Sequence, residues 1–192
     1  RRTRHDWRGS VERGYAILRE RCDRVVVAGF STGAGMALDQ AVSHPERYRA
    51  LVAISAPLLF ANPLSNVAGL ACLANSLLKS VGLRSLSRDF ATNHPDNPDI
   101  NYRRCPLVCL HQVTLLMLKV YWCLRRLEIP ALIVQGDGDP KVAPVSGPAL
   151  YRRIGSTFKR YVEIQCQQHG IVRGAAAPLT LAAVRDFLAE VA

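Results

Sequence analysis

The stretch of sequence that decides the fold is Gly29-Phe30-Ser31-Thr32-Gly33. The apolar run Val-Val-Val-Ala at residues 25–28 precedes it, and apolar residues then repeat at helical spacing at Ala34, Ala37, Leu38, Ala41 and Val42. A β-branched run predicts a buried strand, so Ser31 is expected on a sharp turn between this strand and the following helix. The alternative is a glycine-rich loop in which the serine is incidental.

This turn also has a chemical use. Glycines at 29 and 33 are expected because strand and helix backbones approach too closely there for a Cβ atom. A serine at the start of the helix lies beside backbone N–H groups that can stabilise a developing oxyanion. The turn is therefore a candidate site for nucleophilic catalysis by Ser31.

Length and composition indicate one domain with a substantial core, because the chain has 192 residues of which 49% are hydrophobic. The net charge of +10 comes mostly from arginines scattered along the sequence, which predicts no nucleic-acid partner. The densest basic stretch, residues 1–24, also carries Asp6, Glu12, Glu20 and Asp23. A helix face with both signs of charge explains this stretch as well as a basic arm does.

The cysteines form no C-x-x-C pair, and we expect them to be reduced thiols buried as small hydrophobic residues, which favours a cytoplasmic location. They are Cys22, Cys72, Cys105, Cys109, Cys123 and Cys166. Cys105, Cys109 and His111 fit no zinc pattern, so the sequence predicts no metal and no cofactor. With no signal peptide and no initiator methionine, the chain is expected to be a piece of a longer protein.

Helices and strands are predicted to alternate at both ends of the chain. A first helix at residues 7–18, capped by Asp6 or Ser10, precedes the strand at 25–28. The Ser31 helix ends near His44-Pro45, and a strand at 50–54 completes a strand–helix–strand unit with parallel strands. Further strands at 131–134 and 161–164 and helices at 146–154 and 178–191 are expected after Pro130.

The segment 58–128 interrupts this alternation. Two apolar helical stripes predict helices there, with a Pro- and Asn-rich loop at 93–99 between them. The stripes are Val67, Leu70, Ala71, Ala74, Leu77, Leu78, Val81 and then Val113, Leu116, Met117, Val120, Leu124, Leu127. The second stripe is apolar enough for a membrane span, but Lys119 interrupts it, so a helical cap packed on the remaining domain is favoured.

A serine nucleophile needs a base and a third group that orients the base. Asp137 and Asp139 lie in a turn after one predicted strand, and His169 follows another. Because carboxyl ends of parallel strands meet at one sheet edge, these side chains are expected beside Ser31. The remaining histidines, at 5, 44 and 94, are expected to have solvated, non-catalytic roles.

The order Ser31, Asp139, His169 resembles the α/β-hydrolase superfamily, in particular bacterial carboxylesterases, monoacylglycerol lipases and lysophospholipases. Residues 23–55 and 130–142 carry this resemblance. It implies that Ser31 is the nucleophile, Asp139 the orienting acid and His169 the general base. Asp139 is preferred because it has the family's glycine three residues before it and a hydrophobic residue, Val142, three residues after it; Asp137 is the alternative acid.

The implied fold is α/β, a partial α/β-hydrolase with a mainly parallel sheet flanked by helices. Residues 1–57 and 129–192 would form the core, and residues 58–128 an inserted helical cap. Family members have four strands before the nucleophile strand, and nothing here corresponds to them. The strand before Ser31 is therefore expected at a sheet edge. Thr32 would supply one oxyanion-hole donor, and the second donor is not in this chain.

These features predict a serine hydrolase that cleaves carboxylic esters through an acyl-enzyme on Ser31. The apolar cap suggests monoacylglycerols, lysolipids or medium-chain esters as substrates. The alternatives are another acyl hydrolase or acyltransferase, such as a peptidase or thioesterase, on the same three residues. A further alternative is a non-catalytic lipid- or partner-binding module that makes peripheral membrane contact, its Arg-rich N-terminal helix touching anionic surfaces.

Overall fold

The computed structural model describes residues 3–93, 95, 99 and 101–191. Its central sheet has the strand order β1-β2-β5-β6. The strands are β1 (Val26–Phe30), β2 (Ala50–Ile54), β5 (Ala131–Gly136) and β6 (Lys159–Ile164). All three pairings are parallel, with Val26 opposite Ala50, Leu51 opposite Ala131 and Ala131 opposite Lys159. The predicted mainly parallel sheet is confirmed.

Burial in the sheet follows strand position. Every residue of β2 and β5 is buried, as expected for continuous apolar strands covered on both faces. In β1 only Val27 is buried, while Val26 and Ala28 are exposed. This pattern fits the place of β1 at the edge of the sheet, as the sequence predicts.

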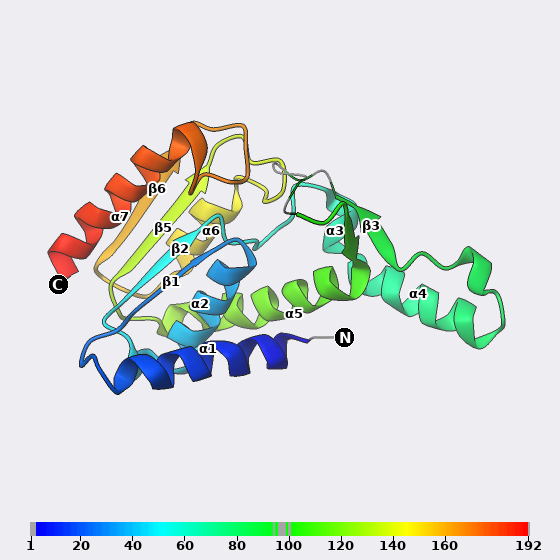
Figure 1. Cartoon of the computed structure of the whole chain (residues 1–192), viewed down its shortest axis with the longest axis horizontal. Helices are drawn as coiled ribbons and strands as arrows, with labels where there is room; N and C mark the ends of the chain where they lie inside the picture. The colour runs from blue at the N-terminus through cyan, green and yellow to red at the C-terminus, as the bar shows by residue number, and fades with distance from the viewer. Residues whose placement is uncertain (1–2, 94, 96–98, 100, 192) are drawn as a thin grey trace.

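Helices cover both faces of the sheet (Figure 1). On one face lie α1 (Arg4–Arg19), α2 (Thr32–Ser43), α5 (Leu107–Cys123) and α6 (Ser146–Arg153), around the larger core cluster. On the other, α7 (Ala177–Val191) buries Phe187 against β2 and β5. The α/β architecture predicted from the alternation of elements is therefore correct.

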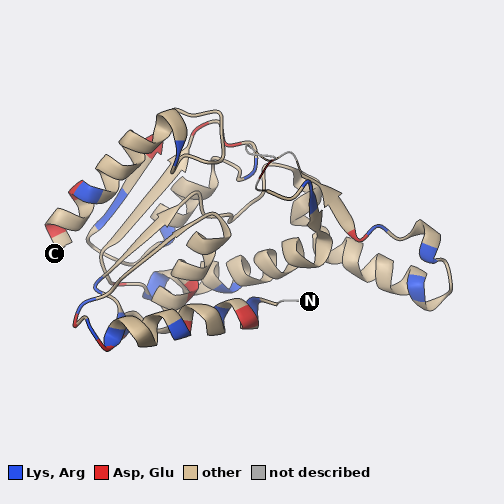
Figure 2. Cartoon of the chain, viewed as in Figure 1, with Lys and Arg blue, Asp and Glu red and all other residues tan. Residues whose placement is uncertain are grey.

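Helix α1 begins earlier than predicted. Its N-cap is Thr3, whose backbone N–H donates to Asp6 Oδ2 at 2.7 Å, so Asp6 lies inside the first turn and is not the cap. Asp39 of α2 is fully buried and binds Arg8 of α1 at 2.6 Å and Lys119 of α5 at 2.8 Å. These ion pairs join three helices on one face, and Figure 2 shows the charged residues along α1.

The described residues of segment 58–106 form an arm, of which α4 (Ala68–Ser80) extends away from the sheet (Figure 1). The arm also contains α3 (Pro63–Asn66) and a hairpin of β3 (Phe90–Thr92) and β4 (Arg104–Pro106). The hairpin was not predicted, because strands of three residues leave no periodicity to detect. The predicted loop 93–99 falls partly outside the described residues.

Most of the apolar residues that were predicted to form the buried face of α4 are exposed to solvent instead. Leu70 and Leu77 are 69% and 60% exposed, and Val67 and Val81 are exposed as well. Helix α4 instead faces α5 through small residues, because Ala68 is fully buried and a Cβ on Gly69 would lie 2.7 Å from the His111 ring. Close approach of the two helices turns the leucines outward.

Helix α5 packs mainly against α2 and α4 and places Val113, Met117 and Val120 in the larger core cluster. By length and composition alone, the helical stretch 107–126 could also cross a membrane. The boundary predicted at residue 128 assigns this helix to the cap, but its buried face is part of the core.

The cysteines are less buried than the sequence predicts. All six are free thiols, but Cys22 is exposed and the other five are only partly buried. Cys22 lies in the connection after α1, and Cys72 and Cys109 lie on helices of which one side faces solvent.

Candidate active site

Ser31 lies at the turn between β1 and α2 with the uncommon dihedral angles φ 56° and ψ −125°. Its N–H donates to the Ile54 carbonyl of β2 at 2.9 Å, and its carbonyl accepts the N–H of Ala34 at 2.9 Å. The strained conformation is therefore fixed from both the sheet and the helix.

The two glycines of this turn are not equivalent. A Cβ on Gly29 would lie 2.2 Å from the Gly33 carbonyl oxygen, so only glycine fits there, as predicted. A Cβ on Gly33 would meet nothing within 4 Å, so the prediction that this position needs glycine is wrong. The close approach is made by the backbone of Gly33, while its own Cβ position points into open space.

His169 follows β6 and lies between the two other predicted residues. Its Nε2 is 2.8 Å from Ser31 Oγ, and its Nδ1 is 2.8 Å from Asp139 Oδ2. The Phe30 ring packs against the imidazole with a centroid distance of 4.8 Å. Residues from three separate parts of the chain thus form one continuous hydrogen-bonded row at the carboxyl ends of the strands.

Asp139 is held as a carboxylate. Its Oδ1 accepts the backbone N–H groups of Lys141 at 2.8 Å and Val142 at 3.0 Å. Burial would raise the pKa of Asp139, but the hydrogen bond and charge of His169 and the two backbone N–H groups together hold this pKa below its usual value. The carboxylate can therefore accept the His169 N–H and stabilise a positive imidazolium.

Asp137 has a different environment. It is exposed, and its Oδ1 accepts the Cys166 backbone N–H at 2.9 Å, which ties the turn after β5 to the turn after β6. The structure thus brings Asp139 rather than Asp137 to the imidazole.

Thr32 is the first residue of α2 and adjoins Ser31. A backbone N–H at this position has no acceptor within its own helix, so it can donate to a group bound at Ser31. The role of Thr32 as an oxyanion-hole donor stays a prediction.

A cavity of about 650 Å³ opens beside Ser31 and His169. Apolar atoms come from Phe30, Phe60, Leu110 and Val172, and amides from Asn62 and Asn93. Charged side chains come from Lys141 and Arg173. The arm supplies Phe60, Asn62 and Asn93, so core and arm together enclose the site.

The chain matches the family model described as "Serine aminopeptidase, S33" over residues 11–174. It belongs to this serine hydrolase family. The hydrolase is 30% identical over 190 residues to the thermostable monoacylglycerol lipase of Bacillus sp. (strain H-257), covering 99% of this chain and 72% of that relative.

Solved structures confirm the α/β-hydrolase fold of this family member. One from work on the metagenome-derived lipolytic enzymes LipS and LipT superposes with a TM-score of 0.80 and 22% identity, over 98% of this chain and 74% of that chain. The monoacylglycerol lipase of Paleococcus ferrophilus gives a TM-score of 0.78 and 17% identity, over 100% of this chain and 77% of that chain.

The other candidate residues lie apart from this row. His5 is exposed, His44 Nδ1 is 3.7 Å from Glu46, and His94 lies outside the described residues. Within the described part of the chain, no three His, Cys, Asp or Glu residues are grouped to hold a metal. Burial raises the pKa of Cys105, which lines the cavity, and so favours its protonated thiol form.

Three residues of the site had not been singled out from the sequence. Gln135 Nε2 lies 3.5 Å from Asp139 Oδ2, and Lys141 and Arg173 line the cavity. Arg173 follows His169 by four residues and Lys141 follows Asp139 by two, but a spacing of this kind carries no signal without the folded turns.

Proposed function

We propose that this hydrolase cleaves carboxylic esters through an acyl-enzyme on Ser31, with His169 as general base and acid and Asp139 as the orienting group. The observation that carries the proposal is the pair of 2.8 Å contacts joining Ser31 Oγ, His169 and Asp139. A base in hydrogen-bond contact with a strained, helix-terminal serine is the arrangement that activates a hydroxyl nucleophile.

In the first half-reaction Ser31 Oγ attacks the ester carbonyl carbon while His169 Nε2 takes the hydroxyl proton. The Thr32 N–H stabilises the resulting oxyanion. The bond to the alcohol oxygen then breaks as His169 protonates that oxygen, leaving the acyl group on Ser31. In the second half, water attacks the acyl carbon while His169 Nε2 takes a proton from it. The bond between the acyl carbon and Ser31 Oγ then breaks as His169 returns that proton to Oγ, which releases a carboxylic acid and restores the Ser31 hydroxyl.

For the acyl group we propose a lipid or medium-chain ester such as a monoacylglycerol or lysolipid. The relatives named as monoacylglycerol lipases and the apolar wall of Phe30, Phe60 and Leu110 support this choice. An aminopeptidase reaction is less well supported, because a substrate ammonium group needs a negative partner. The charged side chains among the described pocket residues, Lys141 and Arg173, are instead positive.

The test is labelling with a fluorophosphonate probe, combined with turnover of p-nitrophenyl butyrate. Ser31→Ala and His169→Ala should each abolish labelling and turnover. Ser10→Ala is the matched control, because Ser10 is an exposed serine of α1 outside the cavity, and it should keep both. Labelling that persists in Ser31→Ala would refute the assignment.

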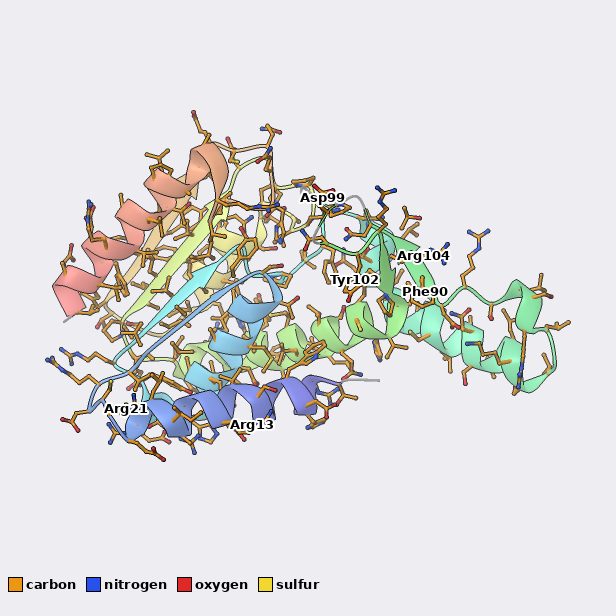
Figure 3. The ribbon with its side chains drawn as sticks, viewed as in Figure 1. Arg13, Arg21, Phe90, Asp99, Tyr102 and Arg104 are labelled. Carbon is orange, nitrogen blue, oxygen red and sulfur yellow. The ribbon has the colours of Figure 1, made fainter. Side chains whose placement is uncertain are left out.

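We also propose that the arm contacts a membrane surface. Leu70, Leu73 and Leu77 are each about 60–70% exposed along one side of α4. Exposed Phe90, Tyr102 and Arg104 project from the hairpin region of the same arm (Figure 3). Leucines and aromatic rings bordered by exposed arginines match an anionic lipid surface.

This contact can be measured by flotation with phosphatidylglycerol vesicles in the Ser31→Ala background, where no lipid is consumed. Leu70→Gln with Leu73→Gln should weaken binding roughly tenfold. Leu179→Gln with Leu181→Gln on α7 is the control, because these leucines are 60% and 59% exposed on another face. Equal binding by the two double variants would exclude α4 as the contact.

A further inference from the structure

The cavity beside Ser31 has positive charge that the reaction does not use. Lys141 is partly buried, and its Nζ donates to the neutral amide oxygen of Asn93 at 2.8 Å. Arg173 is exposed at the cavity wall. Within the described part of the chain, neither side chain forms an ion pair. Both charges are thus available to a bound molecule.

These cations belong to the turns that hold the reacting groups. Lys141 lies in the turn of Asp139, and its backbone N–H binds that carboxylate. Arg173 lies in the turn of His169, and its backbone N–H donates to the Gly170 carbonyl at 3.1 Å. Their side chains therefore border the cavity on the side of His169.

The proton transfer by His169 indicates which part of the substrate lies on the His169 side of the cavity. His169 returns a proton to the oxygen of the leaving alcohol, so the alcohol portion of an ester must lie next to the imidazole. The apolar residues Phe60 and Leu110 come from the arm and the start of α5, and they suit the acyl chain. An anionic substituent on the alcohol would be placed near Lys141 and Arg173.

We propose that Lys141 and Arg173 form a subsite for a phosphate on the leaving alcohol, so that acyl esters of glycerol phosphate are preferred over neutral monoacylglycerols. This inference rests on the proposed ester hydrolysis at Ser31. A phosphate dianion matches two cations and accepts several charge-assisted hydrogen bonds. A carboxylate on the alcohol could form the same kind of charge-assisted hydrogen bonds, but it carries one negative charge fewer than a phosphate dianion.

The experiment compares kcat/KM for 1-octanoylglycerol 3-phosphate and 1-octanoylglycerol, which share a short acyl chain and are used below their micelle concentrations. The phosphate ester should be preferred, and added salt should reduce the preference. Lys141→Gln and Arg173→Gln should each lower the ratio of the two kcat/KM values by about three- to tenfold. Arg173→Lys should retain most of the ratio because the charge is kept.

Arg185→Gln is the matched control, because it removes one exposed positive charge from α7, away from the cavity. It should leave the ratio unchanged, which separates a local subsite from general attraction by the net charge of +10. Fluorophosphonate labelling rates and melting temperatures verify that each variant is folded.

The outcomes are distinguishable. If the protein is labelled and turns over 1-octanoylglycerol but does not prefer the phosphate ester, the subsite alone is overturned. The same holds if Arg185→Gln lowers the ratio of the two kcat/KM values as much as Lys141→Gln and Arg173→Gln do. Preference for 3-octanoylglycerate, which carries a carboxylate, without preference for the phosphate ester would overturn the phosphate assignment. Absence of both labelling and ester turnover would overturn the proposed function itself and the subsite with it.

Discussion

Replacing Gly29 by alanine tests whether the turn before α2 sets the position of Ser31. The added Cβ would lie 2.2 Å from the Gly33 carbonyl oxygen, 2.3 Å from its carbonyl carbon and 2.6 Å from the Ala34 nitrogen. All three are backbone atoms, so no side chain can rotate away. The first turn of α2 must move by about 1 Å to restore ordinary van der Waals contact.

Overpacking of this kind costs about 1–3 kcal/mol, and we expect the upper end because backbone has to move. In a chain of this length about 3 kcal/mol corresponds to a fall in melting temperature of roughly 6–12 °C. A displacement of about 1 Å at Ser31 should also slow ester turnover about 100-fold. Melting followed by circular dichroism and fluorophosphonate labelling rates measure the two effects.

Gly33→Ala provides the matched control, because its Cβ would meet nothing within 4 Å. Alanine is the better helix former by up to about 1 kcal/mol, so this variant should melt at or above the wild-type temperature and keep its labelling rate. If Gly29→Ala behaved like Gly33→Ala, the argument that backbone contact positions the nucleophile would be wrong.

Two further predictions concern charged residues. Because the pKa of Asp139 is lowered in the folded state, its contribution to the free energy of unfolding should be full above its unfolded-chain pKa of about 3.9 and disappear as pH falls through the lower folded value. The stability difference between wild type and Asp139→Asn, measured in urea, should therefore shrink below about pH 4; a difference that grows there would contradict the shift. Arg8→Met with Lys119→Met leaves buried Asp39 without these cations and should reduce the free energy of unfolding by about 3–5 kcal/mol. Adding Asp39→Leu should recover part of that loss, and no recovery would show that the carboxylate charge is not its cause.

Local sequence signals predicted most of the fold. The runs at β2 and β5 are continuously apolar because both faces are covered, and the turn at Ser31 has its glycine where backbone contact requires one. Carboxyl ends of parallel strands share one edge, so His169 and Asp139 could be expected beside Ser31 without knowing the intervening structure.

The errors arose where tertiary contacts decide the outcome. The leucines of α4 have the periodicity of a buried face, but Gly69 admits the His111 ring so closely that α4 packs through its small residues. Periodicity shows that a helix has two faces, and only packing selects which one is covered. Lys141 and Arg173 were missed for a related reason, since an isolated cation acquires meaning only when folded turns carry it to a cavity.

The ion pairs of Asp39 have a mechanical consequence for Ser31. The Ser31 N–H donates to the Ile54 carbonyl of β2, which joins the nucleophile to the sheet. The helical layer adds lateral stiffness at the reacting oxygen, because ion pairs of buried Asp39 join α2 to Arg8 of α1 and to Lys119 of α5. Weakening these ion pairs should make the Ser31–His169 distance more variable before the sheet unfolds. A change far from the pocket would then reduce catalysis before it reduces the stability of the sheet.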